Sequence, residues 1–169
     1  MSEIMNPRDL FLHELADVLY VERGLAEETL PKLIGEVQDE EFKAGLESHL
    51  EETRGHVKNV ERVFGELGEE PTTEQCVGFE GLKKEHDELR AQASSSLVDQ
   101  IDLGAAARTE CYEIAAYESL RRMAKAMGED RAVELLDENL KQEKAALKEV
   151  EKIATRLTRE AAAAMTAAR

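Results

Sequence analysis

The sequence contains no tryptophan, only three prolines and only 4% aromatic residues. β-Sheets are enriched in aromatic and β-branched residues, so this composition argues against a sheet as the main element. Charged residues make up 35% of the chain and hydrophobic residues 42%. This balance is typical of long amphipathic helices with one solvated face. The composition therefore predicts an all-α protein.

The chain also lacks the signals of a membrane or secreted protein. It has no apolar run of about 18 residues, the length that would indicate a membrane-spanning helix. Its first residues contain neither the basic nor the apolar segment of a signal peptide. Its two cysteines, Cys76 and Cys111, have no CxxC spacing, which argues against a disulfide framework or a zinc site. We therefore expect a cytoplasmic protein whose cysteines are small core residues.

Basic residues are few. Lysine and arginine number 22 against 37 acidic residues, and the formal net charge is −15. A surface of this charge repels phosphate backbones and anionic lipids. Neither nucleic acid nor a membrane is an expected partner.

The length and the helix signals indicate a single domain, residues 1–169, because a chain of this size can form one core but not two ordinary ones. Asn6 followed by Pro7 is typical of a helix start, and Gly68 and Gly128 are typical of helix ends. The apolar periodicity predicts four long helices and one short amphipathic helix. The long helices span residues 7–37, 40–67, 99–127 and 130–165, and the short one spans residues 76–93.

The connection over residues 69–98 decides the topology. A helix as long as the second one spans roughly 40 Å at 1.5 Å per residue. A connection of this length can return along that helix and start the third helix parallel to the second. We therefore predict a ferritin-like antiparallel four-helix bundle with a long crossover that contains the short helix. The alternative is an ordinary up-down-up-down bundle with an inserted helix.

Glutamates interrupt three of the apolar stripes near the middle of the helices. Glu22 follows Leu15 and Leu19 in the first helix; Glu110 and Glu113 lie in the third, and Glu143 lies in the fourth. A buried carboxylate is costly unless it is paired, and several together require a compensating cation. Hard metal ions with oxygen ligands are the natural partner.

The second helix offers nitrogen ligands at the same level of the bundle. Glu52 and His56 lie four residues apart on one face, and His49 lies one turn earlier. An imidazole favours iron, manganese or zinc over calcium. The competing interpretation is that each glutamate lies at the edge of its stripe and pairs with a lysine or arginine one turn away.

Other reactive side chains are interpreted as structural. We expect His13 and His86 to lie at the surface and Cys111 to be an inert core residue. The three tyrosines near the predicted ligands are expected to fill the core, with hydrogen bonding to the ligands as the alternative: Tyr20, Tyr112 and Tyr117.

Four segments in order resemble the YciE/YciF family of ferritin-like stress proteins: HELADVLYVE (13–22), HLEET (49–53), ECYEIAAY (110–117) and EKA (143–145). The similarity covers nearly the whole chain, including residues 76–82. It implies a rubrerythrin-like bundle with a dinuclear iron or manganese centre, a tendency to form homodimers and a role in the stress response. The family's motif glutamates fall on Glu22, Glu52, Glu110, Glu113 and Glu143.

The chain departs from the family pattern at four positions. It has His56 where the pattern has glutamine, Cys111 where it has histidine, and Gln142 and Leu147 where it has glutamate and aspartate. Leu147 removes a possible ligand one turn after Glu143, which suggests a weaker or more open second metal position.

These observations lead to one main hypothesis and two alternatives. The main hypothesis is a dinuclear iron or manganese protein that reacts with oxygen or peroxide, with ferroxidase- or peroxidase-type oxidoreductase activity. Its predicted ligands are Glu22, Glu52, His56, Glu110, Glu113 and Glu143, with His49 as an additional candidate. The alternatives are a non-catalytic helical stress or interaction protein without a metal centre and, less favoured, an iron-storage subunit.

Overall fold

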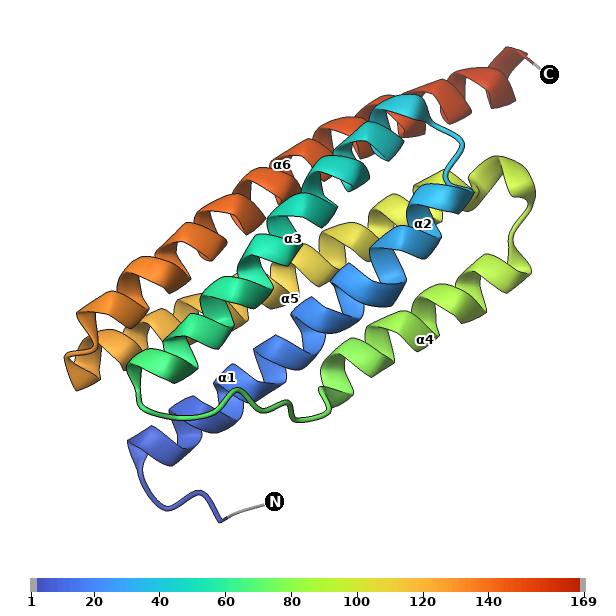
Figure 1. The fold of residues 1–169 in the computed structure, drawn as a ribbon. Helices are drawn as coiled ribbons and strands as arrows, with labels where there is room; N and C mark the ends of the chain where they lie inside the picture. Colours follow the sequence, from blue (N-terminus) through green and yellow to red (C-terminus); the bar gives the residue numbers. More distant parts are fainter. Residues whose placement is uncertain (1–2, 168–169) are drawn as a thin grey trace.

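A computed structural model describes residues 3–167 and contains four long helical segments packed as a bundle, with one further helix on the outside (Figure 1). The elements are α1 (Pro7–Gly24), η1 (Leu25–Thr29), α2 (Leu30–Glu36), α3 (Glu40–Glu66), α4 (Val77–Gln92), η2 (Ser95–Leu97), α5 (Val98–Met127) and α6 (Asp130–Ala167). The predicted all-α class is confirmed.

The first helical segment begins as predicted but contains a wide turn. The Asn6 side chain accepts a hydrogen bond from the Asp9 N–H, and Pro7 occupies the first turn. The predicted single helix over 7–37 is interrupted by the π-helical turn η1, in which the Leu30 N–H donates to the Leu25 carbonyl. Pro31 follows directly and has no N–H of its own. A proline ring clashes with the carbonyl four residues earlier, and a wider turn relieves this clash.

Helix α3 runs antiparallel to α1. It starts at Asp39, whose side chain accepts a hydrogen bond from the Phe42 N–H. It ends next to the start of α1, where Arg8 donates to the Leu67 carbonyl at 2.8 Å. Gly68 follows with φ +73°, a conformation that favours glycine.

The crossover brings the chain back along the bundle. Helix α4 lies outside the bundle beside α5, and η2 then leads into α5 next to the α2–α3 turn (Figure 1). At this point the Asp99 carboxylate accepts hydrogen bonds from the Gln38 and Asp39 N–H groups. Helix α5 therefore starts at the same end as α3 and runs parallel to it. This is the predicted ferritin-like topology and not an up-down-up-down bundle.

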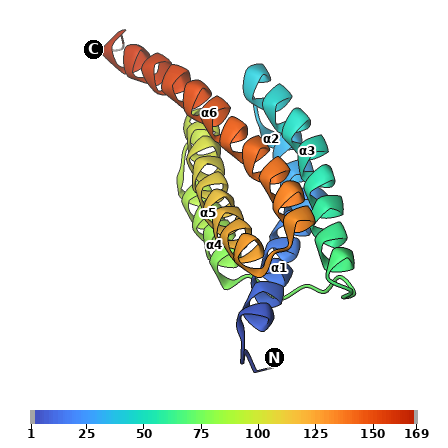
Figure 2. The same cartoon turned by 90° about the vertical axis from the view of Figure 1, so that its left-hand side faces the viewer.

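Helices α5 and α6 form the second antiparallel hairpin. Gly128, at φ +79°, donates from its N–H to the Ala124 and Lys125 carbonyls and ends α5. Helix α6 continues to Ala167, slightly beyond the predicted end at residue 165. Its C-terminal turns extend past the other helices (Figure 2).

Two apolar clusters fill the bundle, one towards each end. The first is centred on aromatic and aliphatic residues of α1, α3, α5 and α6, including Phe11, Leu19, Phe64, Tyr117 and Leu136. The second lies towards the α2–α3 turn and includes Leu30, Phe42, Phe79, Leu103 and Ile153. Buried polar residues near the middle of the bundle separate the two clusters and form a polar belt: Glu22, His49, Thr53, His56, Glu110, Glu113, Asn139 and Glu143.

The cysteines do not behave alike. Cys76 is buried, and its Sγ accepts a hydrogen bond from the Phe79 N–H at the start of α4. Cys111 is exposed, so the expectation that it packs in the core was wrong. The Cys76 thiol contacts the Tyr112 hydroxyl, whereas Cys111 faces outward.

His86 is also placed differently from the prediction. It was expected at the surface, but its side chain is 18% exposed and contacts the Asp102 carboxylate at 2.7 Å. Arg90 approaches the same carboxylate at 3.0 Å. Asp102 is completely buried in α5, so these two contacts fasten α4 onto the bundle.

Within residues 3–167, no helix is both long enough and apolar enough to cross a membrane.

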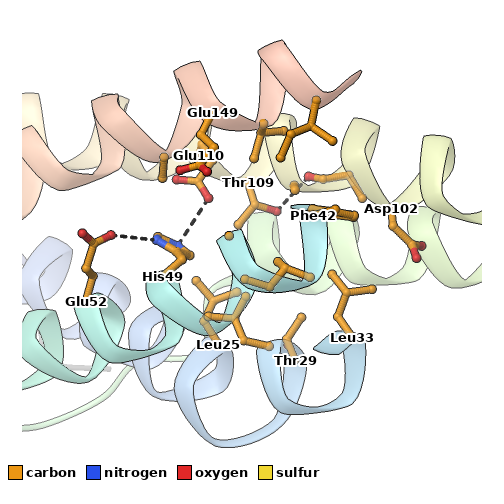
Figure 3. Close-up of a pocket in the computed structure, with 18 of the residues that line it drawn as sticks. Leu25, Thr29, Leu33, Phe42, His49, Glu52, Asp102, Thr109, Glu110 and Glu149 are labelled. Atoms are coloured by element: carbon orange, nitrogen blue, oxygen red, sulfur yellow. Dashed lines mark hydrogen bonds and ion pairs between the residues drawn. The ribbon is translucent and has the colours of Figure 1, made fainter. Parts of the chain in front are cut away.

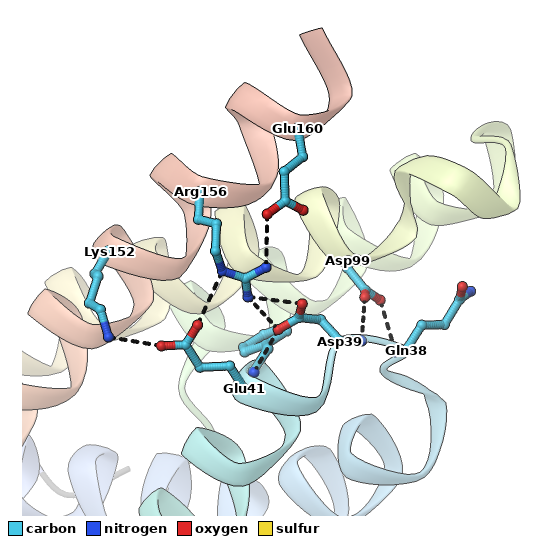
Figure 4. Close-up of polar contacts among 8 residues, drawn as sticks. Gln38, Asp39, Glu41, Asp99, Lys152, Arg156 and Glu160 are labelled. Carbon is cyan, nitrogen blue, oxygen red and sulfur yellow. Dashed lines mark hydrogen bonds and ion pairs between the residues drawn. The ribbon is translucent and has the colours of Figure 1, made fainter. Parts of the chain in front are cut away.

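A polar network joins α6 and the start of α5 to the α2–α3 turn (Figure 4). Arg156 of α6 donates to both oxygens of Asp39 at 2.7 and 2.9 Å. Burial alone would raise the pKa of Asp39, but hydrogen bonds from Arg156 and the Phe42 N–H outweigh it and lower that pKa. The ionised carboxylate is therefore both a helix cap and an ion-pair partner.

We expect Asp39→Ala to destabilise the metal-free protein by about 0.5–2 kcal/mol, the usual effect of removing a helix N-cap. Asp39→Asn keeps a capping oxygen and should cost less. Because the folded-state pKa of Asp39 is lowered, its charge stabilises the fold above the unfolded value of about 3.9 and less as the pH falls through the folded value. Urea unfolding followed by circular dichroism measures both variants. Equal losses of unfolding free energy in the two variants would show that the capping oxygen contributes nothing to stability.

Candidate metal centre

All four long helical segments contribute to the polar belt. Glu22 lies in the last turn of α1, and Glu143 lies in α6. His49 and His56 are seven residues apart in α3, so two helical turns place them on the same face. On α5, Glu110 and Glu113 are three residues apart and share a face in the same way. These six side chains are buried.

A first group consists of Glu22, His56 and Glu143, whose ligand atoms lie within 4.8 Å of one another. His56 Nδ1 is 2.8 Å from Glu143 Oε1 and 3.4 Å from Glu22 Oε1. Both nitrogen and oxygen donors therefore converge on one point from α1, α3 and α6.

A second group consists of His49, Glu110 and Glu143, again with ligand atoms within 4.8 Å of one another. His49 Nε2 is 3.3 Å from Glu110 Oε1 and 4.0 Å from Glu143 Oε2. Glu143 belongs to both groups and turns one carboxylate oxygen toward each histidine. The two groups are therefore adjacent and share one carboxylate.

Glu113 belongs to neither group but lies next to both. Neither of its carboxylate oxygens has a hydrogen-bond partner among the described residues, and the same is true of one oxygen each of Glu22 and Glu110. Buried polar atoms are normally paired, so a cluster of unpaired acceptors requires an explanation. Carboxylate oxygens together with two imidazoles form the ligand set of di-iron and di-manganese bundles. The residues thus fit a dinuclear metal centre.

A second layer of side chains orients the candidate ligands. Tyr117 donates from its hydroxyl to Glu22, and Asn139 donates both to that hydroxyl and to the His56 carbonyl. Gln142 Oε1 lies 2.8 Å from His56 Nε2 and can accept a hydrogen bond from an Nε2–H group. The other ring nitrogen of His56, Nδ1, then faces Glu143. Such outer contacts fix the ring orientation of metal-binding histidines. The departure from the family pattern at Gln142 thus has a structural role.

Asn139 was missed by the sequence reasoning. It is completely buried and lies four residues before Glu143, on the same face of α6. A polar residue adjacent to Leu140 in the apolar stripe was the available signal.

The structure places Glu52 at the edge of the centre and not inside it. Its side chain is 38% exposed and lies 3.7 Å from His49 Nδ1. It belongs to neither three-residue group, whereas His49, the additional candidate, belongs to one. Leu147, one turn after Glu143, is half-buried and has no ligand atom. Glu143 is therefore the carboxylate that α6 contributes to the two groups.

Burial makes three carboxyl groups hard to ionise. It raises the pKa of Glu22, although the neighbouring His56 acts in the opposite direction. Burial raises the pKa of Glu110 to about 11, with a further contribution from Glu143. It also raises the pKa of Glu113 well above its usual range, and the nearby charges of Glu143, Glu22 and Glu110 act in the same direction. Glu110 therefore holds a proton at neutral pH when no cation is present, and the raised pKa of Glu113 favours its protonated form in the same way.

An ion pair carries the remaining charge. Burial disfavours a charged imidazole, but Glu22 and Glu143 outweigh it and raise the pKa of His56 to about 11. Burial also disfavours a charged Glu143, yet hydrogen bonds with His56 and Glu110 lower the pKa of this carboxyl. Without metal, the centre is balanced by protons and by a His56–Glu143 ion pair.

Comparison with known proteins adds the family. The family described as "Domain of unknown function (DUF892)" matches residues 6–163. Protein YciF of Escherichia coli (strain K12) is 33% identical over 139 residues, which cover 81% of this chain and 83% of YciF. The chain belongs to the DUF892 family.

Solved structures agree with this assignment. The structure of the E. coli stress protein YciF matches with a TM-score of 0.86 at 29% identity, covering 92% of this chain and 99% of that chain. YcfI of Rhodopseudomonas palustris matches with a TM-score of 0.85 at 36% identity, covering 89% and 96%. A protein of Xanthomonas campestris pv. campestris, 22% identical with a TM-score of 0.68, shares the fold. The resemblance to YciF and the helical-bundle fold are both confirmed.

We expect this DUF892 protein to release protons when it takes up a divalent ion. Glu110, Glu113 and His56 hold protons in the metal-free state and must lose them to act as ligands. Affinity should therefore rise with pH. Anaerobic calorimetric titration with Mn²⁺ in buffers of different ionisation enthalpy measures the proton count. A binding heat that does not depend on the buffer would contradict this protonation pattern.

Proposed function

We propose that the protein binds two iron or manganese ions in the centre of the bundle and reacts with oxygen or peroxide as part of a stress response. One observation carries the proposal: the two buried ligand groups share Glu143 and lie within one bundle. A carboxylate with a histidine on each side could serve two neighbouring metal ions at once, and bundles that hold such ion pairs use glutamates and histidines from facing helices.

Each group would hold one ion. Glu22 and His56 would bind the first, His49 and Glu110 the second, and Glu143 would bridge them. Glu113, with two unpaired buried oxygens, would supply a further ligand or a second bridge. When bound, the two ions would supply the redox chemistry toward oxygen or peroxide.

The protein's own residues would set the conditions for that chemistry. Tyr117 and Asn139 hold Glu22 and His56 in place through hydrogen bonds. The apolar clusters on both sides of the belt limit the access of water. Leu147 leaves α6 without a carboxylate one turn after Glu143, which supports an open position on one ion. Glu52, at the edge, would orient His49 and not bind metal directly.

The protonation of the centre favours a second candidate, a non-catalytic stress or interaction protein. Protons on Glu110 and Glu113 and the His56–Glu143 ion pair balance the buried charge without any metal. On this alternative, chelators leave the melting temperature unchanged. On the metal proposal, iron or manganese raises it, because an ion that binds the folded state stabilises it.

The first test is the metal content of untagged protein from cells supplemented with iron and manganese, measured by elemental mass spectrometry. We expect about two ions per chain, as in di-iron and di-manganese bundles. Replacing Glu113 and Glu143 together with alanine should abolish stoichiometric binding. Glu118→Ala with Glu138→Ala is the matched control, because these glutamates lie on the same two helices outside the belt. Undiminished binding in the belt variant, or no metal in the reconstituted wild type, would reject the proposal.

Single substitutions should separate the two ions. Glu22→Ala removes a ligand from the first group alone, and Glu110→Ala removes one from the second alone. Each should lower the metal content to about one ion, whereas Glu143→Ala should weaken both sites, because bridging ligands serve two ions. Electron paramagnetic resonance of manganese-loaded protein should show a coupled pair in the wild type and isolated Mn²⁺ in Glu110→Ala. Isolated signals in the wild type would mean that the ions do not share a carboxylate.

A further inference from the structure

A cavity of about 140 Å³ lies between the helices on the His49–Glu110 side of the centre, toward the α2–α3 turn (Figure 3). Residues from η1, α2, α3, α4, α5 and α6 line it. The walls are mainly apolar and include Leu25, Leu33, Phe42, Leu46 and Ile153. The second apolar cluster is therefore not completely filled.

Small side chains create this space. Ala105 and Ala106 of α5, Ala146 of α6 and Gly45 of α3 line the cavity and are partly buried. Protein interiors are normally packed to the density of organic crystals. A leucine at one of these alanines would fill much of the space, so the local sequence keeps the cavity open.

His49 and Glu110 lie together at the end of the cavity next to the centre, with Glu52 beside them (Figure 3). Other polar residues border the cavity elsewhere, among them Lys83, His86 and Asp102. His49 Nδ1 and Glu110 Oε2 are buried and have no hydrogen-bond partner among the described residues. A mainly apolar cavity with a few convergent polar groups is the usual form of a small-molecule site.

The wide turn η1 forms part of the same wall. Leu25 and Thr29, its first and last residues, both line the cavity. π-Helical turns are uncommon and occur frequently at functional sites. This backbone feature is independent of the polar groups at the other side of the cavity.

Size and charge define the ligand. An apolar cavity of about 150 Å³ in another protein binds benzene. The acidic side chains of Glu52, Asp102 and Glu149 border this cavity against the single ammonium group of Lys83, so an anionic ligand would be repelled. A neutral molecule with one hydroxyl group could place its ring among the apolar side chains and its hydroxyl against His49 or Glu110.

We propose that this cavity binds a neutral, benzene-sized organic molecule with a single polar group, which reaches the His49–Glu110 side of the metal centre. The cavity is a property of the protein itself, and only its role beside a metal rests on the proposed function.

The experiment titrates metal-free protein with phenol, with benzoate as the anionic control, and follows amide resonances by NMR and the melting temperature. We expect saturable shifts for His49, Glu110 and Leu25, small shifts for Asn139 beyond the centre, and a higher melting temperature with phenol. Benzoate should produce neither effect.

Ala106→Leu should abolish saturable phenol binding, and Ala146→Leu, on another helix, provides an independent test. Ala115→Leu is the matched control, because Ala115 is exposed on the same helix as Ala106 and does not line the cavity. Phenol binding that persists in a folded filling variant, or no saturable shifts in the wild type, would overturn the proposal. Since these measurements use metal-free protein, phenol binding in a protein that takes up no metal would reject the metal proposal and leave this one standing.

Discussion

The structure depends on one electrostatic constraint: several carboxyl groups are buried together in the middle of a bundle that otherwise has an apolar interior. His56 lies between Glu22 and Glu143 and supplies the positive charge that the belt contains without metal. Protons neutralise other members. The arrangement folds in this balanced form, and the same side chains can exchange protons for cations. The same long helices thus provide the apolar clusters at both ends of the bundle and the candidate metal ligands in the middle.

Much of the fold could be predicted from the sequence, because helices show their buried faces through apolar spacing. The long segment between the two hairpins distinguished the ferritin-like topology from an ordinary bundle. The burial of Glu22, Glu110, Glu113 and Glu143 also followed from their stripe positions. Their role as metal ligands remains a prediction.

The features that the sequence did not reveal depend on contacts between helices. Glu52 lies three residues after His49 and four before His56, so it flanks their shared face, and only the rotation of α3 in the bundle places it at the edge. The pairing of His86 with Asp102 depends on how α4 docks, which periodicity within one helix does not reveal. Cys111 lies beside the buried Glu110, yet one step along a helix turns a side chain by about 100° and brings it to solvent.

The wide turn η1 holds one residue more than an α-helical turn. This extra residue determines which side chains of α2 face the core. Leu30 and Leu33 point into the core beyond the turn, while Glu22 points into the core before it. Rewinding Leu25–Thr29 as a regular α-helix with no residue deleted would rotate one of these two faces by about 100° relative to the other. The helix can therefore serve the polar belt and the apolar end of the bundle together only while the irregular turn is retained.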